Sequence, residues 1–185
     1  MSGNPRLRLT HFGLFVGDLE VMERFYTQVM GLTVTDRGPY PNEEQFPYMV
    51  FLSSDPKEHH QFVLISGRPD EVDFSLNQQM SFLVDSLDDL RATLGRVQAA
   101  GVEDMESRTH GNAWSIYFPD PEGNRIEVYT HTPWHVPQPH LREMDFGRPV
   151  SQIMAETEAH CRSTEGFMSA EAREREMKEL MGIGD

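Results

Sequence analysis

The chain has 185 residues, of which 38% are hydrophobic and 25% charged, and its formal net charge is −14. These values are ordinary for a globular protein of one domain or two small fused modules, and the acidic balance argues against binding to nucleic-acid phosphates. No apolar run approaches the length of a membrane span, and MSGNPRLRLT lacks the apolar core of a signal peptide. The single cysteine, Cys161, cannot form an internal disulfide, so we expect a cytoplasmic protein without membrane or nucleic-acid partners.

The first predicted elements are a strand and a helix. Residues 9–16 (LTHFGLFV) predict a strand, and Asp18 stands where it can cap a helix whose apolar side chains recur at helical spacing as far as Met30. Gly31 is expected to end this helix. Further strands are predicted in residues 32–38, 47–54 and 59–67.

The same order of elements then repeats. Residues 76–90 (LNQQMSFLVDSLDDL) align with residues 8–22 (RLTHFGLFVGDLEVM), so that the apolar positions coincide and His11 falls opposite Gln79. In the second copy we expect a strand at 79–84, a helix from the cap Ser86 to Gly101, strands at 102–108, 113–120 and 124–130, and a turn at PDPEGN.

Each copy is therefore a βαβββ unit, too small to bury its own sheet well. We predict an α+β domain over residues 7–134, in which modules 7–68 and 76–131 form a curved mixed sheet with helices outside and a hollow inside. Residues 135–185 predict a Pro-rich extended segment and a C-terminal helical extension of two polar helices. We expect this tail to pack on the domain or on a second subunit, and it carries no evident chemistry.

Alternation along the strands sorts side chains by face, and the more apolar rows should pack beneath the helices. This places His11 and Gln79 on the hollow face, and the closing strands add one position each. A lone histidine at a strand start, or a glutamate in an alternating strand, is more often structural than a ligand. Three of the four symmetric positions can nevertheless bind a metal, and these four are His11, Leu64, Gln79 and Glu127.

These segments resemble the vicinal-oxygen-chelate superfamily of glyoxalases, bleomycin-binding proteins, methylmalonyl epimerases and extradiol ring-cleavage dioxygenases. The resemblance covers residues 7–134 and rests on HFGLFVGDLEVMERFYTQVMGL, SFLVDSLDDL and YFPDPEGNRIEVY. It implies paired βαβββ modules with a divalent metal held in the hollow, and the ligands that it implies here are His11, Gln79 and Glu127.

The segments HHQFVL and HGNAWSIYFPDPEGNRIE are most similar to single-domain extradiol dioxygenases. This resemblance implies that His60 acts as general base and then acid, and that His110 and Tyr117 hydrogen-bond the substrate oxygens. Alternation places His60 on the same face as Leu64, although EHH can also be a solvated strand entry. Four aromatic residues are candidates to line a pocket, the last two also fitting core positions: Trp114, Tyr129, Phe12 and Phe62.

Gln79 departs from the extradiol pattern, because these enzymes are expected to have histidine there and so hold Fe(II) with two histidines and one carboxylate. Three explanations stay open: Gln79 binds the metal through its amide oxygen, His60 supplies the second imidazole, or the metal has been lost. We expect a retained metal, with Fe(II) or Mn(II) favoured.

The resemblance thus implies a homodimeric ring-cleavage dioxygenase whose partners are a small catechol-like vicinal diol and O2. One alternative is a glyoxalase- or epimerase-like lyase or isomerase with a redox-silent metal. Another is a non-catalytic binder of the bleomycin-resistance type, which would use a dimer crevice lined by aromatic and acidic groups.

Overall fold

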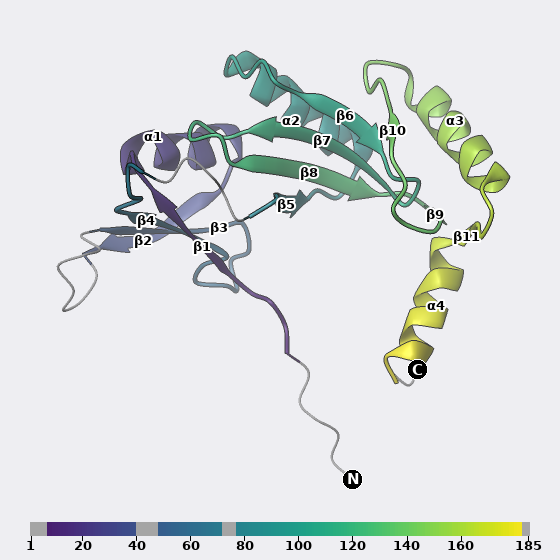
Figure 1. Ribbon diagram of the computed structural model, residues 1–185, viewed down its shortest axis with the longest axis horizontal. Coiled ribbons are helices and arrows are strands. Elements are labelled where there is room, and N and C mark those ends of the chain that lie inside the picture. The colour runs from purple at the N-terminus through teal and green to yellow at the C-terminus, as the bar shows by residue number, and fades with distance from the viewer. Residues whose placement is uncertain (1–6, 40–47, 72–76, 183–185) are drawn as a thin grey trace, which may run out of the picture. The chain divides into compact units, whose positions relative to one another are not determined.

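The computed structural model describes residues 7–39, 48–71 and 77–182 (Figure 1). It confirms the predicted α+β class and the two βαβββ modules. The chain divides into two compact units, one of residues 1–76 with 120–123 and one of residues 77–119 with 124–185. In the part of the chain that the structure describes, no helix is both long enough and apolar enough to cross a bilayer.

The first unit holds a four-stranded sheet in the order β1-β4-β3-β2. Strands β1 and β4 are parallel, and the other neighbours are antiparallel. The elements of this unit are β1 (Phe12–Val16), α1 (Leu19–Arg24), the π-helical turn η1 (Phe25–Val29), β2 (Thr33–Gly38), β3 (Met49–Ser53) and β4 (Phe62–Ser66).

Helix α1 begins where the sequence predicts, because the Asp18 carboxylate accepts a hydrogen bond from the Val21 main-chain N–H. After α1 the backbone widens into η1, a change that the 3.6-residue spacing of the apolar side chains does not predict. Gly31 ends the helix with a φ of +79°. Tyr26 of η1 is fully buried and lies 4.6 Å from Phe62 between ring centroids, so η1 covers β4.

The second unit holds a five-stranded sheet in the order β10-β6-β7-β8-β5, with β5 and β8 parallel. Helix α2 packs against β7 and β8 (Figure 1). Ser86 caps α2 as predicted, by accepting a hydrogen bond from the Asp89 main-chain N–H. The elements are β5 (Met80–Leu83), α2 (Leu87–Ala99), β6 (Glu106–Thr109), β7 (Ala113–Pro119), β8 (Arg125–His131), β9 (Trp134–His135), β10 (Arg142–Glu143), α3 (Val150–Ser163), β11 (Met168–Ser169) and α4 (Ala170–Leu180).

The C-terminal segment belongs to the second unit, where β10 extends the sheet beside β6 and β9 pairs with β11. Both predicted tail helices are present as α3 and α4. Trp114 is buried, and its Nε1–H donates a hydrogen bond of 2.9 Å to the Thr157 hydroxyl in α3. Trp114 therefore anchors α3, and its prediction as a pocket-lining residue was wrong because sequence alternation does not show which residues the tail covers.

Candidate active site

The parallel strand pairs of the two modules share one register, and this register fixes which positions are equivalent. Gly13 pairs with Val63 in the first module, and Ser81 pairs with Glu127 in the second. Because Gly13 and Ser81 are equivalent in the repeat, the counterpart of Glu127 is Val63. The prediction of Leu64 at this position was wrong, since Leu64 is fully buried one residue further along β4.

The error arose from counting along each strand, because Leu64 and Glu127 are both third in their strands, whereas β8 begins one residue earlier than β4 relative to its parallel partner. Strand β4 begins at Phe62, so His59 and His60 precede it and alternation cannot be counted back through them. His11 likewise lies one residue before β1, which begins at Phe12. The three histidines therefore lie just before the strands and not within them. Strand alternation does not apply to them, so their contacts show where the rings lie.

The second unit brings together the predicted residues His110, Tyr117 and Glu127. His110 lies in the loop between β6 and β7, Tyr117 in β7 and Glu127 directly opposite it in β8. The His110 Nε2 is 2.7 Å from the Tyr117 hydroxyl, which donates a hydrogen bond of 2.5 Å to the Glu127 Oε1. Strand pairing thus places the imidazole, phenol and carboxylate in one hydrogen-bonded series.

The other carboxylate oxygen of Glu127 accepts two hydrogen bonds. The Gln79 Nε2 donates over 2.8 Å and the Ser81 hydroxyl over 2.6 Å, both to Oε2. Glu127 is only 8% exposed, and its ion-pair partner among the described residues is His110 at 3.8 Å. A buried carboxylate is costly unless hydrogen bonds or a cation compensate it, and here three neutral donors do so in part.

Proton counting shows what this series can do. The His110 Nδ1 is 2.8 Å from the His140 main-chain oxygen, which can only accept, so Nδ1 carries a hydrogen. The two short contacts of the Tyr117 oxygen, to His110 and to Glu127, need two protons, and Tyr117 itself supplies one. A proton on either the imidazole or the carboxyl group would complete both contacts, and a hydrogen-bonded series of this kind can carry a proton along itself.

Burial and the neighbouring Glu127 raise the pKa of two tyrosines on this surface. For Tyr117 the largest cause is burial, followed by its hydrogen bond to Glu127 and the charge of that carboxylate, so that its pKa lies well above the ordinary value. Burial also raises the pKa of Tyr129, with a smaller contribution from Glu127. Both phenols therefore stay protonated at neutral pH and can donate hydrogen bonds. Tyr129 remains a candidate to contact a ligand.

The first unit gathers three histidines, two of which contact Phe51. The rings of His11 and His60 are 4.6 Å apart between centroids, and Phe51 lies 5.2 Å from His60. The Nδ1 atoms of His59 and His60 are 2.9 Å apart. Burial, and then the neighbours His11 and His59, lower the pKa of His60, so its imidazole is neutral near pH 7 and can accept a proton.

A family profile described as the Glyoxalase/Bleomycin resistance protein/Dioxygenase superfamily matches residues 8–128. The matched span includes both βαβββ modules as far as the middle of β8. The chain belongs to this superfamily. The resemblance stated from the sequence is therefore confirmed, and a divalent metal is the cofactor that the superfamily implies.

Two curated relatives carry different activities in their names. Biphenyl-2,3-diol 1,2-dioxygenase 3 of Rhodococcus globerulus is 31% identical over 126 residues, which are 65% of this chain and 62% of the relative. The probable lactoylglutathione lyase of Vibrio cholerae is 28% identical over 131 residues, 69% of this chain and 94% of the relative. The chain thus spans less than two thirds of the dioxygenase's length, and the superfamily membership does not choose between the two chemistries.

Solved structures of the superfamily share the fold. A glyoxylase/bleomycin resistance protein/dioxygenase domain from Frankia sp. EAN1pec has a TM-score of 0.57 at 22% identity, covering 69% of this chain and all of that domain. The fosfomycin resistance protein FosX from Listeria monocytogenes, complexed with Mn(II) and sulfate, has a TM-score of 0.52 at 20% identity, covering 68% of this chain and 93% of that one. At such identities the likeness shows the fold alone.

The donors of the second unit fit the metal that the superfamily implies. Glu127 is a buried carboxylate that lacks a lysine or arginine ion-pair partner among the described residues, and Gln79 lies beside it. The Gln79 Nε2 faces the Glu127 Oε2 in this structure, so the amide group would have to turn over for its oxygen to bind the same ion. Over the same residues, no three His, Cys, Asp or Glu side chains are grouped as metal ligands. The predicted set contains two side chains of these types, His11 and Glu127, with the Gln79 amide as the third donor.

Sequence reasoning missed three contributors to the second unit's network. Ser81 was given no part in the site, although its place two positions after Gln79 on one strand face was the available signal. Gln138 and the His140 main chain were missed altogether. No spacing rule identifies a main-chain acceptor in a Pro-rich segment, because the carbonyl group is the same for every residue type.

Proposed function

We propose that the protein is a metal-dependent, extradiol-type dioxygenase that cleaves the ring of a small catechol-like vicinal diol with O2. The observation that carries the proposal is the Tyr117 hydroxyl, 2.7 Å from the His110 Nε2 and 2.5 Å from the Glu127 Oε1. These side chains can donate hydrogen bonds to ionised diol oxygens and return a proton to them. The 31% identity to a biphenyl-diol dioxygenase supports this choice of substrate.

The ligands that we propose for the metal are His11, Gln79 and Glu127, as the sequence predicts. When bound, the metal lowers the pKa of a diol hydroxyl and orients the reactants. The amide oxygen of Gln79 is a harder, more weakly binding donor for iron than imidazole, and this favours Mn(II) over Fe(II) in the wild-type protein. The proposal includes the homodimer and cytoplasmic location predicted from the sequence.

His60 is the proposed general base. Its imidazole is neutral near pH 7 for the reasons given above, and it can remove a proton from the diol and later return it. Its neighbour His59 is more exposed and makes the same kind of ring contact with Phe51, so it serves as a matched control. Replacing His60 by alanine should abolish turnover with the metal content unchanged, whereas His59→Ala should keep most of the turnover.

A second candidate is a lyase or isomerase that removes a proton next to a carbonyl. The neutral Gln79 donor beside Glu127 suits a redox-silent metal such as Mg(II). The lyase relative also matches over 94% of its length, against 62% for the dioxygenase. The same His60 and His110 would then move protons on a carbonyl substrate without oxygen.

The two candidates are separated by metal analysis of anaerobically purified protein, combined with oxygen uptake on a panel of catechols. Iron or manganese at about one per chain, as expected for a single site, together with uptake, supports the dioxygenase. A redox-silent metal without uptake supports the lyase or isomerase. Protein that takes up no divalent metal at all would overturn both, in favour of the non-catalytic binder.

A further inference from the structure

The C-terminal segment packs tightly against the loop that carries His110. The Thr132 hydroxyl donates a hydrogen bond of 2.5 Å to the Gly111 main-chain oxygen. A Cβ atom added to Gly111 would lie 2.5 Å from the Val136 Cγ2 and 3.3 Å from the Cys161 Sγ, so nothing larger than glycine fits there without displacement. The loop is thus packed between Val136, which directly follows β9, and Cys161 of α3.

Gln138 ties this loop to the segment that follows β9. Its Nε2 donates to the His110 main-chain oxygen over 2.8 Å, while its Oε1 accepts from the His140 main-chain N–H over 3.0 Å. The His140 main-chain oxygen in turn accepts from the His110 Nδ1 over 2.8 Å. These three hydrogen bonds form a closed series. It runs from the His110 backbone through the Gln138 side chain and the His140 backbone to the His110 ring.

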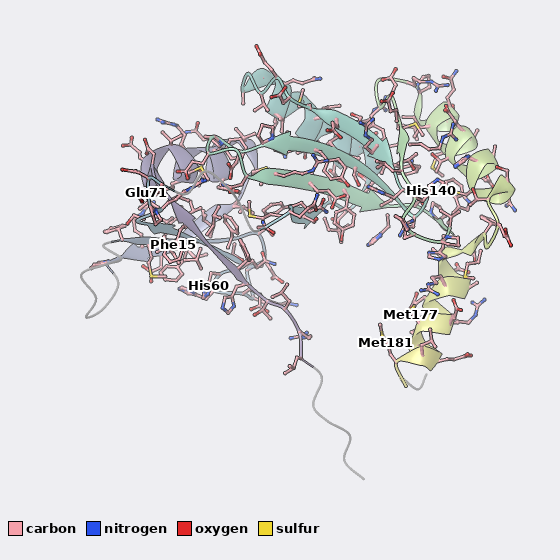
Figure 2. The ribbon with its side chains drawn as sticks, in the orientation of Figure 1. Phe15, His60, Glu71, His140, Met177 and Met181 are labelled. Carbon is pink, nitrogen blue, oxygen red and sulfur yellow. The ribbon has the colours of Figure 1, made fainter. Side chains whose placement is uncertain are left out.

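Helix α3 supports His140 from the other side. The Nε2 atoms of His140 and His160 are 2.9 Å apart, and their ring centroids are 4.9 Å apart with the ring planes tilted by 32°. Figure 2 labels His140, which lies between the strand ends of its sheet and α3. The helix is itself anchored, because Cys161 is fully buried and Thr157 accepts the Trp114 hydrogen bond.

We infer that Gln138 and His160 are positioning residues that hold the His110 imidazole with Nδ1–H on the His140 carbonyl and Nε2 toward Tyr117. The inference rests on the proposed function only in giving His110 a part in proton transfer. Both residues lie beyond residue 128, where the superfamily match ends. The C-terminal tail, which the sequence marks as an appendage without chemistry, would thereby complete the site. An acid–base group that is held in the wrong place slows the reaction even when the group itself is unchanged.

The test is 15N NMR of the imidazole nitrogens in the full-length protein prepared with diamagnetic Mg(II), with His110 assigned by comparison with His110→Gln. Wild-type His110 should show a protonated Nδ1 that exchanges slowly with water. In Gln138→Leu and His160→Ala this exchange should quicken by roughly 2- to 10-fold, the effect of losing one hydrogen bond. The controls Gln152→Leu and Arg162→Ala, on exposed positions of α3, should leave it unchanged.

Where a catechol or carbonyl substrate is turned over, kcat of Gln138→Leu should fall roughly tenfold with little change in KM, as expected for a misaligned group. If Gln138→Leu fails to fold, Gln138→Glu keeps the acceptor for His140 and loses only the donor to His110. Unchanged Nδ1 exchange in both Gln138 and His160 variants would overturn the inference while leaving the proposed function intact. A changed NMR signature in protein that turns over nothing would support positioning and count against the proposed function.

Discussion

The two modules share one architecture and one register, yet their equivalent positions carry opposite chemistry. In each module the parallel strand pair and its antiparallel neighbour align in the same way. The second module fills the shared positions with a hydrogen-bonded polar set, and the first with two apolar side chains, a glycine and a histidine. The equivalent pairs are His11 and Gln79, Gly13 and Ser81, Phe51 and Tyr117, and Val63 and Glu127.

The first module shows that the fold does not require the polar set. Val63 and Phe51 pair across β4 and β3 in the same register as Glu127 and Tyr117 across β8 and β7. Burying a carboxylate costs free energy that an apolar side chain at the same place does not. The network around Glu127 is therefore best explained by the site it builds, and the comparison can be tested by changing one module and its counterpart in turn.

The largest effect is expected at Glu127. Glu127→Gln keeps the size of the side chain but removes the negative charge that would hold a cation. Affinity for Mn(II) should fall by at least about 100-fold, the upper end of what loss of a supporting partner costs, and turnover should fall with it. Isothermal titration of the metal-stripped protein measures the change.

Val63→Ala is the counterpart in the first module. It removes two buried methyl groups, so it should lower the thermal midpoint but leave Mn(II) affinity within experimental error. Equal losses of metal in Glu127→Gln and Val63→Ala would show that the affinity follows overall stability, and Glu127 would no longer qualify as a ligand.

Tyr117→Phe should have the next largest effect. It deletes the hydroxyl between His110 and Glu127 but keeps the ring, so metal stays bound while kcat falls by roughly 100-fold, the cost of losing one donor to a developing charge. The unfolding free energy should also drop by about 1–3 kcal/mol, because Glu127 loses a buried hydrogen bond. Steady-state kinetics and urea unfolding separate the two effects.

Tyr26→Phe offers a matched control in the first unit. The Tyr26 hydroxyl donates a buried hydrogen bond of 3.0 Å to the Asp120 carboxylate, the same kind of pair without the histidine. We expect a similar loss of stability and no loss of kcat. A comparable fall of kcat in both variants would mean that Tyr117 acts through folding alone.

The repeat explains why so much of this arrangement could be predicted. Hydrophobic periodicity and the caps Asp18 and Ser86 located both modules, because local hydrogen bonds fix where a helix begins. Glu127 was found from the repeat and from strand alternation, and His110 and Tyr117 were found by resemblance; the structure brings the three into contact. The register failed by one residue at Leu64 because β8 begins one residue earlier than β4 relative to its parallel partner, and a single sequence does not show where strand pairing begins.

The tail resisted prediction for a different reason. Gln138 and the His140 carbonyl act through long-range hydrogen bonds to a loop about thirty residues earlier in the chain, as the separations of 28 and 30 show. Composition marks this stretch only as Pro-rich and extended. Such contacts depend on how the segment folds back onto the loop that carries His110. A single sequence shows no pattern from which they could be predicted.

A smaller effect is expected from making the modules more alike at Gln79. Gln79→His gives the second module the residue that His11 provides in the first, and it supplies a second imidazole for iron. Fe(II) affinity should rise by roughly tenfold relative to Mg(II), following the preference of borderline metals for nitrogen donors. Competition binding under anaerobic conditions measures the ratio.

The reciprocal change, His11→Gln, should shift the preference in the opposite direction, toward Mg(II). If Gln79→His leaves the Fe(II) to Mg(II) ratio unchanged while His11→Gln alters it, Gln79 does not bind the metal. The explanation in which His60 supplies the second imidazole would then gain support, and His60→Gln would be expected to lower Fe(II) affinity.

The smallest expected effect concerns how the stability of the protein depends on pH. Burial lowers the pKa of His60 in the first unit and of His140 and His160 in the second, with Arg142 adding to the effect on the latter two. An unfolded histidine, with a pKa near 6.5, takes up its proton before these folded ones do. Stability from the lowered pKa values is therefore fully present above pH 6.5 and is lost as pH falls through the folded values.

Between pH 7.5 and 5.5 the thermal midpoint should therefore decline, by on the order of a few degrees for a chain of this size. The decline should be shallower in His160→Gln, because this change leaves His140 without a second imidazole 2.9 Å away to repel it when both are charged. The control Gln152→Leu, at an exposed position of α3 that carries no ionisable group, should keep the wild-type slope. A slope unaltered by His160→Gln would mean that the His140–His160 pair does not link proton uptake to the packing of α3, and the pH dependence would have to come from His60 of the first unit instead.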